Sequence, residues 1–138
     1  MTNKKDINAG IIIIGNEILS GRTKDTNTST LAVWLNSLGI KVDEVRVIPD
    51  IEQTIIDTVN IFRKKFSYVF TSGGIGPTHD DITSSSISKA FKMKYGAHKE
   101  AFKILEKYYK PGEFNEGRQK MAWMPVEANL ILNPTSGA

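Results

Sequence analysis

The sequence predicts an α/β domain with a mostly parallel sheet, and two observations support this fold class. Apolar runs rich in β-branched residues alternate along the chain with segments whose apolar residues recur at helical spacing. The first run, residues 9–14, is almost continuously aliphatic, which is typical of a strand buried on both faces of a parallel sheet. Regular alternation of strand and helix favours parallel pairing, because each crossover helix returns the chain to the same edge of the sheet.

The first helix is predicted by an apolar stripe at i, i+3, i+4 and i+7 that ends at Gly39: Leu31, Trp34, Leu35 and Leu38. Trp34 and Trp123 are expected in a core or an interface. Similar spacing predicts helices within residues 55–62, 87–91 and 101–108. A further short helix is expected over residues 114–123. Further strands are expected at 40–48, 68–71 and 130–132. Because no repeat or linker interrupts the pattern, residues 1–138 are expected to form one domain.

The composition excludes several kinds of chemistry. The chain has no cysteine and only two histidines, which excludes a disulfide framework and a thiolate zinc site and disfavours a multi-histidine metal cluster. Any metal would therefore have oxygen ligands, which favours magnesium, manganese or calcium. The net charge of +3 and the absence of a nucleic-acid-binding motif predict no nucleic-acid partner. No apolar run is long enough to span a membrane, so a cytoplasmic protein is expected.

Polar residues and glycines follow each of the first three predicted strands. The first strand runs into Gly15-Asn16-Glu17, the second into Pro49-Asp50 and the third into Ser72-Gly73-Gly74. Ligands of open parallel sheets bind beyond the carboxyl ends of the strands, where loops and helix N-termini converge. These three strand ends are therefore the candidate functional loops.

The most specific of these loops is residues 71–83, which reads T-S-G-G-I-G-P-T-H-D-D-I-T. Its glycines allow the backbone to turn and to approach a ligand, and their amides can bind a phosphate or a carboxylate. Asp80 and Asp81 place two carboxylates beside that anion site, an arrangement that a divalent cation bridging to phosphate oxygens makes favourable. Asp81 or Thr83 could instead cap the following helix, and both roles are compatible.

This loop resembles the GGxGPTxDDxT signature of CinA-type proteins, whose N-terminal domain belongs to the molybdopterin-binding superfamily of MoaB, Mog and gephyrin. The segment beginning at Gly15 resembles that family's GxExLxG…(D/N)TN pattern, and residues 47–50 resemble its V-x-D segment. Residues 118–125 and 133–138 resemble the later A-x-x-P and N-P-x-G-x-A-P-G segments. The resemblance implies a three-layer α/β/α domain and covers nearly the whole chain.

Two departures from the family pattern stand out. Pro77 and the Asp80-Asp81 pair differ from the Mog and gephyrin branch, where Arg-Asp commonly precedes the Val/Ile-Thr, and this disfavours a direct role in molybdopterin synthesis. The sequence also stops inside the N-P-x-G-x-A-P-G loop. The resemblance therefore implies that the last strand and helix of the family domain are missing and that no deamidase domain follows.

The resemblance assigns roles to residues at all three strand ends. It implies that Asp50 and Asp81 are catalytic and that Asp80 and Asp81 hold a metal, with Mg²⁺ expected and K⁺ or Mn²⁺ as alternatives. The residues expected to bind the substrate are Gly15, Glu17, Asn27, Ser72, Gly73, Gly74, Gly76, Pro77, Thr78 and Thr83.

Three functions remain open at this point. The first is magnesium-dependent hydrolysis of a nucleotide diphosphate such as ADP-ribose, an activity associated with the CinA-type domain. The second is adenylyl transfer to molybdopterin, as in Mog and gephyrin-type relatives, with molybdopterin as the ligand. The third is a non-catalytic nucleotide- or pterin-binding module. In each case the partner is a phosphate-bearing small molecule, and the resemblance implies a homodimer or a homotrimer.

Overall fold

The computed structural model describes residues 6–134, and its chain packs as two compact units, Met1–Gly73 and Gly74–Ala138. The expectation of one domain over residues 1–138 stays a prediction. The first unit contains β1 (Asn8–Ile14), α1 (Asn16–Leu19), α2 (Asn27–Ser37), β2 (Lys41–Ile48), α3 (Glu52–Lys65) and β3 (Tyr68–Ser72). The second contains α4 (Thr83–Ala90), β4 (Tyr95–Ala97), α5 (Lys99–Tyr108), α6 (Glu116–Lys120) and β5 (Trp123–Pro125).

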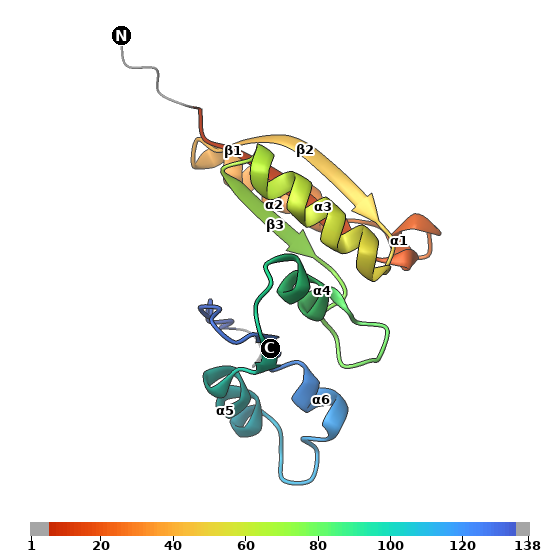
Figure 1. Cartoon of the computed structure of the whole chain (residues 1–138), viewed down its shortest axis with the longest axis vertical. Coiled ribbons are helices and arrows are strands. Elements are labelled where there is room, and N and C mark those ends of the chain that lie inside the picture. Colours follow the sequence, from red (N-terminus) through yellow and green to blue (C-terminus); the bar gives the residue numbers. More distant parts are fainter. Residues whose placement is uncertain (1–5, 135–138) are drawn as a thin grey trace. The chain divides into compact units, whose positions relative to one another are not determined.

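The first unit confirms the predicted α/β fold with a parallel sheet. Its three strands are all parallel in the order β2-β1-β3, and β1 is central. Figure 1 shows α3 in front of this sheet and α2 behind it, as right-handed crossovers to opposite sides of β1 require. Every residue of β1 after Asn8 is buried because both faces of the strand are covered. The first unit is therefore a three-layer arrangement.

Aromatic side chains pack closely over the middle of β1. Phe62 and Phe66 meet edge to face at 5.1 Å, and both are buried. A side chain at Gly10 would lie 2.5 Å from the Phe66 ring, so this position requires glycine. Ile55 and Val59 complete the buried face of α3, at the spacing that the sequence predicted.

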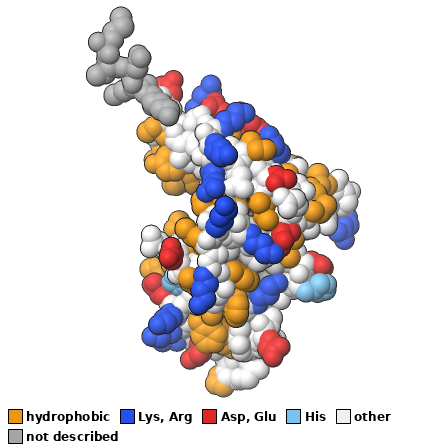
Figure 2. All heavy atoms as spheres, in the orientation of Figure 1, with side chains coloured by type: hydrophobic (Ala, Val, Ile, Leu, Met, Phe, Trp, Pro, Cys, Tyr) orange, Lys and Arg blue, Asp and Glu red, His pale blue; other side chains and the backbone are white. Residues whose placement is uncertain are grey.

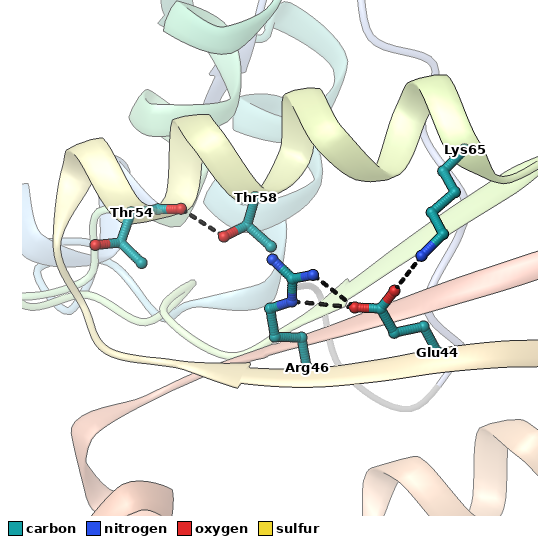
Figure 3. A network of polar contacts seen from close by, with 5 residues as sticks. All are labelled: Glu44, Arg46, Thr54, Thr58 and Lys65. Atoms are coloured by element: carbon teal, nitrogen blue, oxygen red, sulfur yellow. Dashed lines mark hydrogen bonds and ion pairs between the residues drawn. The ribbon is translucent and has the colours of Figure 1, made fainter.

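A polar network lies between β2 and α3, and Figure 3 shows it from close by. Arg46 donates to Glu44 through Nε at 3.1 Å and Nη2 at 2.7 Å, and the Lys65 ammonium lies 2.8 Å from the other carboxylate oxygen. The hydrogen bonds from Lys65 and Arg46 lower the pKa of Glu44. The network ties the end of α3 to the edge strand β2, which alternates exposed and inward residues as predicted for a half-exposed strand.

The second unit has a smaller sheet than the first, with two strands instead of three. Strands β4 and β5 form an antiparallel pair, and a separate apolar cluster is centred on Ala101, Leu105 and Ala122. The predicted helix at 101–108 is confirmed as α5, which His98 caps by accepting a hydrogen bond from the Ala101 amide at 3.3 Å. No helix within residues 6–134 has the length and apolarity to cross a membrane.

Several sequence expectations were wrong in detail. Residues 130–132 lie outside both sheets, because Leu130 packs against the apolar cluster while Ile131 and Leu132 are exposed. The helix expected within 114–123 is shorter, and Trp123 begins β5 instead. In α2 only Leu35 is buried, so Trp34 and Leu38 do not face the core. Figure 2 shows hydrophobic side chains interspersed with charged ones on the visible face.

Candidate functional site

The carboxyl ends of β1 and β2 are joined by two reciprocal hydrogen bonds. The Asn16 amide donates to Asp50 Oδ2 at 3.0 Å, and the Asp50 amide donates to Asn16 Oδ1 at 3.3 Å. The buried Gly15 amide also donates to the Ile48 carbonyl at 3.0 Å. The Glu17 carboxylate folds back over Gly15, since a Cβ there would lie 2.5 Å from it. The first loop therefore places Asp50 against the start of α1.

The end of β3 meets the start of α2 in the same unit. Asn27 donates from its side-chain amide to Ser72 Oγ at 2.8 Å. A cavity of about 320 Å³ lies beside this contact and is lined by Asn27, Thr30, Leu31, Trp34 and Ser72. The structure thus brings the predicted ligand residues Asn27 and Ser72 together, next to a half-exposed tryptophan that the sequence analysis had expected in a core or an interface.

Gly73 follows β3 with φ of +98°, which glycine adopts without strain. A Cβ at this position would lie 2.0 Å from the Ile14 carbonyl oxygen. The backbone after β3 therefore passes so close to the end of β1 that only glycine fits. This close approach explains the first glycine of the predicted loop.

In the second unit, the rest of the loop folds around the carboxylate of Asp81. Oδ2 accepts hydrogen bonds from the Thr78 amide at 2.9 Å and from the Thr78 hydroxyl at 2.8 Å. The Gly76 amide is a further donor to this carboxylate. The buried Thr83 begins α4, and its amide donates to the Gly74 carbonyl at 3.1 Å. These contacts hold Asp81 turned toward its own loop.

The pKa of Asp81 reflects these contacts. Partial burial raises it, but the hydrogen bonds from Thr78 and Gly76 and the positive charge of Lys120 outweigh burial, so the pKa lies below its ordinary value. Asp81 is therefore an anion at neutral pH. It is a poor proton acceptor but a stable ligand for a cation or an orienting group for water.

Asp80 differs from Asp81, although the sequence treated them as a pair. Its carboxylate lies 3.2 Å from His79 Nε2, and both side chains are more than four-fifths exposed. The two aspartates thus have separate partners in the structure. Within residues 6–134, no group of three or more His, Cys, Asp or Glu side chains could hold a metal ion.

A cavity of about 240 Å³ adjoins this loop within the second unit. Its lining includes the polar or glycine residues Gly74, Gly76, Asp81, Ser84 and Lys120 and the apolar or aromatic residues Ile75, Tyr95, Met121, Trp123 and Met124. The rings of Tyr95 and Trp123 meet at 5.4 Å. The cavity therefore offers glycine backbone and charged groups together with aromatic and thioether side chains, a combination that suits a ligand with an anionic and a planar part.

The predicted residues Pro77 and Thr78 form the outer turn of this loop and are exposed. The Pro77 carbonyl oxygen would lie 3.1 Å from a Cβ at Gly117, so α6 approaches the loop closely. Sequence reasoning missed Lys120 and Asn16. Asn16 lies inside the first motif, and Lys120 lies within residues 118–125, which resemble a later family segment, so both could have been singled out from the sequence. Residues 135–138 of the last predicted motif lie outside the described residues.

Comparison with known proteins shows which family the chain belongs to. Residues 10–135 match the model described as "Probable molybdopterin binding domain". The crystal structure of CinA from Thermoplasma acidophilum, a protein of unknown function, is 32% identical and has a TM-score of 0.87. The match covers 95% of this chain and 78% of that one. MoaB from Pyrococcus furiosus, described as a tungsten cofactor synthesizing protein, is 22% identical over 80% of this chain and 67% of its own, with a TM-score of 0.59, and shows the fold alone.

Curated relatives extend beyond the matched region. A protein of Pyrobaculum calidifontis is 40% identical over 132 residues, which are 94% of this chain and 50% of that protein. A protein of Sulfolobus acidocaldarius is 41% identical over 128 residues, or 91% and 48% of the two chains. The chain thus spans about half the length of the curated relatives it matches. With its glycine loop, parallel sheet and likeness to CinA, it belongs to the molybdopterin-binding domain family and to the CinA-type branch of that family.

Proposed function

We propose that the chain binds a phosphate-bearing nucleotide at the glycine loop and hydrolyses its diphosphate bond, with ADP-ribose as the representative substrate and Mg²⁺ as the cofactor. The observation that carries this proposal is the ionised Asp81, fixed by Thr78 at the edge of a glycine-lined cavity. The expectation that Asp81 or Thr83 caps the following helix was wrong, because α4 has Ile82 at its N-cap and no side-chain cap hydrogen bond. The Asp81 carboxylate suits an orienting group for water or a cation ligand instead. The family match supports a ligand of this general chemistry.

The cavity lining includes groups of the kinds that bind a phosphate. Gly74 has φ of +67°, and Gly74 and Gly76 line the cavity without side chains, on either side of Ile75. Backbone amides in such turns bind anions, although the Gly76 amide already donates to Asp81, and Lys120 adds a positive charge to the same cavity lining. The phosphate is therefore proposed to lie against this backbone.

The residues present fit a cation that binds together with a diphosphate. Mg²⁺ keeps several waters and is often held by one or two carboxylates plus substrate phosphates, so a cage of three protein ligands is not required. Asp81 would hold it, and Asp80 could contribute if it left His79. When bound, the cation would neutralise phosphate charge and polarise the phosphorus–oxygen bond.

In the proposed reaction, a water oxygen forms a bond to one phosphorus while the bridging P–O bond breaks, giving AMP and ribose 5-phosphate. Asp81 orients the attacking water, and its low pKa means that the released proton passes to solvent or to the leaving phosphate. The glycine backbone holds the phosphate in place during this step. Asp50 was predicted to be catalytic, and its role stays a prediction.

The test is phosphorus NMR of the chain incubated with ADP-ribose and Mg²⁺. We expect AMP to appear only with the metal, and Asp81→Asn to slow its formation by about 100-fold or more, the range seen when a positioned catalytic group is removed. Asp57→Asn, an exposed aspartate on α3, is the matched control. No turnover by the folded chain with Mg²⁺ present, or equal turnover by Asp81→Asn, would contradict the proposal.

The second candidate function is binding of molybdopterin, with or without adenylyl transfer. It is favoured by the family match and by the aromatic and methionine wall of the cavity, which suits a pterin as well as an adenine ring. Competition between molybdopterin and ADP-ribose for the chain distinguishes the two. Tight binding of either without turnover would favour a non-catalytic module. The proposed homodimer or homotrimer is tested by sedimentation equilibrium.

A further inference from the structure

We propose that Lys120 is a phosphate-binding residue of the glycine loop, which clamps the turn that carries Asp81 and supplies the positive charge that a phosphate needs there. The inference rests on the proposed phosphate site, but not on hydrolysis. Lys120 ends α6, and its Nζ donates to the Thr78 carbonyl at 2.6 Å and to the Asp81 carbonyl at 3.0 Å. Two hydrogen bonds from one ammonium group thus span the whole turn.

The clamp acts on the residues that position Asp81. The Thr78 carbonyl accepts from both Lys120 and the Asp81 amide, and the amide and hydroxyl of Thr78 donate to the Asp81 carboxylate. Gly117, one turn earlier on α6, lies against the Pro77 carbonyl, so the helix meets the loop at two points. Removing the Lys120 ammonium would therefore loosen the turn and the carboxylate together.

The charges around the cavity determine which ligands it can accept. A carboxylate at its edge repels a phosphate, and a cation beside it offsets this repulsion. Lys120 lines the cavity and has three N–H donors, of which two are used by the loop carbonyls. The third is the donor proposed to bind a ligand oxygen. Lys120 thus supplies a positive charge beside Asp81 without a metal.

The neighbouring cation on α6 has a different task. The Arg118 guanidinium lies 4.6 Å from the centre of the Tyr109 ring, and its Nη1 donates to the Glu113 carbonyl at 2.6 Å. Arg118 therefore serves the packing of α6 against the apolar cluster. Of the side chains that line the loop cavity within residues 6–134, Lys120 is the one that carries a positive charge.

The experiment measures binding of inorganic pyrophosphate by calorimetry without metal, at low and at moderate salt. We expect Lys120→Met to weaken binding by about 10- to 100-fold, the range of a charge-assisted hydrogen bond, and to reduce its salt dependence. Lys120→Arg should retain most of the affinity. Lys107→Met, which removes the same charge from an exposed position on α5, is the matched control and should bind like the wild type.

The outcomes separate this inference from the proposed function. Equal binding by Lys120→Met and the wild type, or no pyrophosphate binding by the wild type, would overturn the inference. If pyrophosphate binding depends on Lys120 while ADP-ribose is not hydrolysed, the inference holds and the proposed hydrolysis fails. Circular dichroism of Lys120→Met checks folding, and Lys120→Arg binding far below the wild type would also count against the inference.

Discussion

In the first unit, the groups at the strand ends are positioned by the backbone of a buried parallel sheet, whereas in the second unit the loop is positioned by side chains. Asp50 and Asn16 meet because β1 and β2 are paired residue by residue up to Ile14 and Ile48. Asp81 is held instead by Thr78 and Lys120, which no sheet supports. We therefore expect changes to the core of the first unit to affect chiefly stability, and changes to the loop of the second unit to affect chiefly the proposed ligand binding.

The largest effect should come from the core of the first unit. Phe62→Ala removes a fully buried ring that packs against Phe66 and over Gly10, and we expect a loss of about 4 kcal/mol in the free energy of unfolding. The measurement is urea unfolding followed by circular dichroism. Ile61→Ala, at a half-exposed neighbouring position, should change it by about 0.5 kcal/mol or less. Equal losses in the two variants would break the comparison.

The second prediction concerns the boundary between the sheet and the loop. Gly73→Ala combines a left-handed conformation with a clash against the Ile14 carbonyl, so we expect a loss of about 3 kcal/mol. Gly39→Ala is the control, because its φ of +79° is similar but no atom lies within 4 Å. It should cost about 1 kcal/mol. Similar costs for both variants would show that the close approach to β1 is not tight.

The third prediction sharpens the account of the loop. The pKa of Asp81 is lowered in the folded chain, so the folded state binds fewer protons than the unfolded state at acidic pH. The stability this gives is present above pH 4 and is lost as the pH falls through the folded pKa. Asp81→Asn should therefore be less stable than the wild type by about 1 kcal/mol at pH 7, and this gap should close in acid. A gap that is independent of pH would contradict the ion-based account.

The smallest effect is expected at the surface network of the first unit. Lys65→Met removes the ammonium group that lies 2.8 Å from Glu44, but solvent and salt screen such a pair. We expect a thermal midpoint close to that of the wild type, with any difference disappearing at 1 M salt. Lys64→Met, the adjacent exposed position, serves as the control. A large drop in the thermal midpoint of Lys65→Met that persists at high salt would show that this network contributes strongly to stability, which would contradict the prediction.

Much of the first unit could be predicted from the sequence because its signals are local. The burial of β1 and of one face of α3 can be predicted from the apolar residues of each segment alone, and both predictions were confirmed. Strand β5 was missed because it depends on pairing with β4, about 28 residues earlier, and Leu130 belongs to a cluster rather than a sheet. A short strand has too few residues to give a clear periodic pattern, so whether it forms depends on a partner strand that is distant in the sequence.

The candidate site divides in the same way. The loop around Asp81 could be predicted from its glycines and aspartates, since backbone freedom and charge are properties of the residues themselves. The separation of Asp80 from Asp81 could not, because it depends on which carboxylate Thr78 contacts. Lys120 was missed since its contact with Thr78 joins residues 42 positions apart.

The central claim is that a phosphate-bearing ligand binds at the glycine loop of the second unit. The most direct test is a titration of the ¹⁵N-labelled chain with ADP-ribose and Mg²⁺, followed by amide chemical shifts. The account predicts saturable shifts of the Gly74, Ile75 and Gly76 amides, and a weaker response in Asp81→Asn. Saturable binding that leaves these three amides unchanged, or no binding by the folded chain, would contradict it.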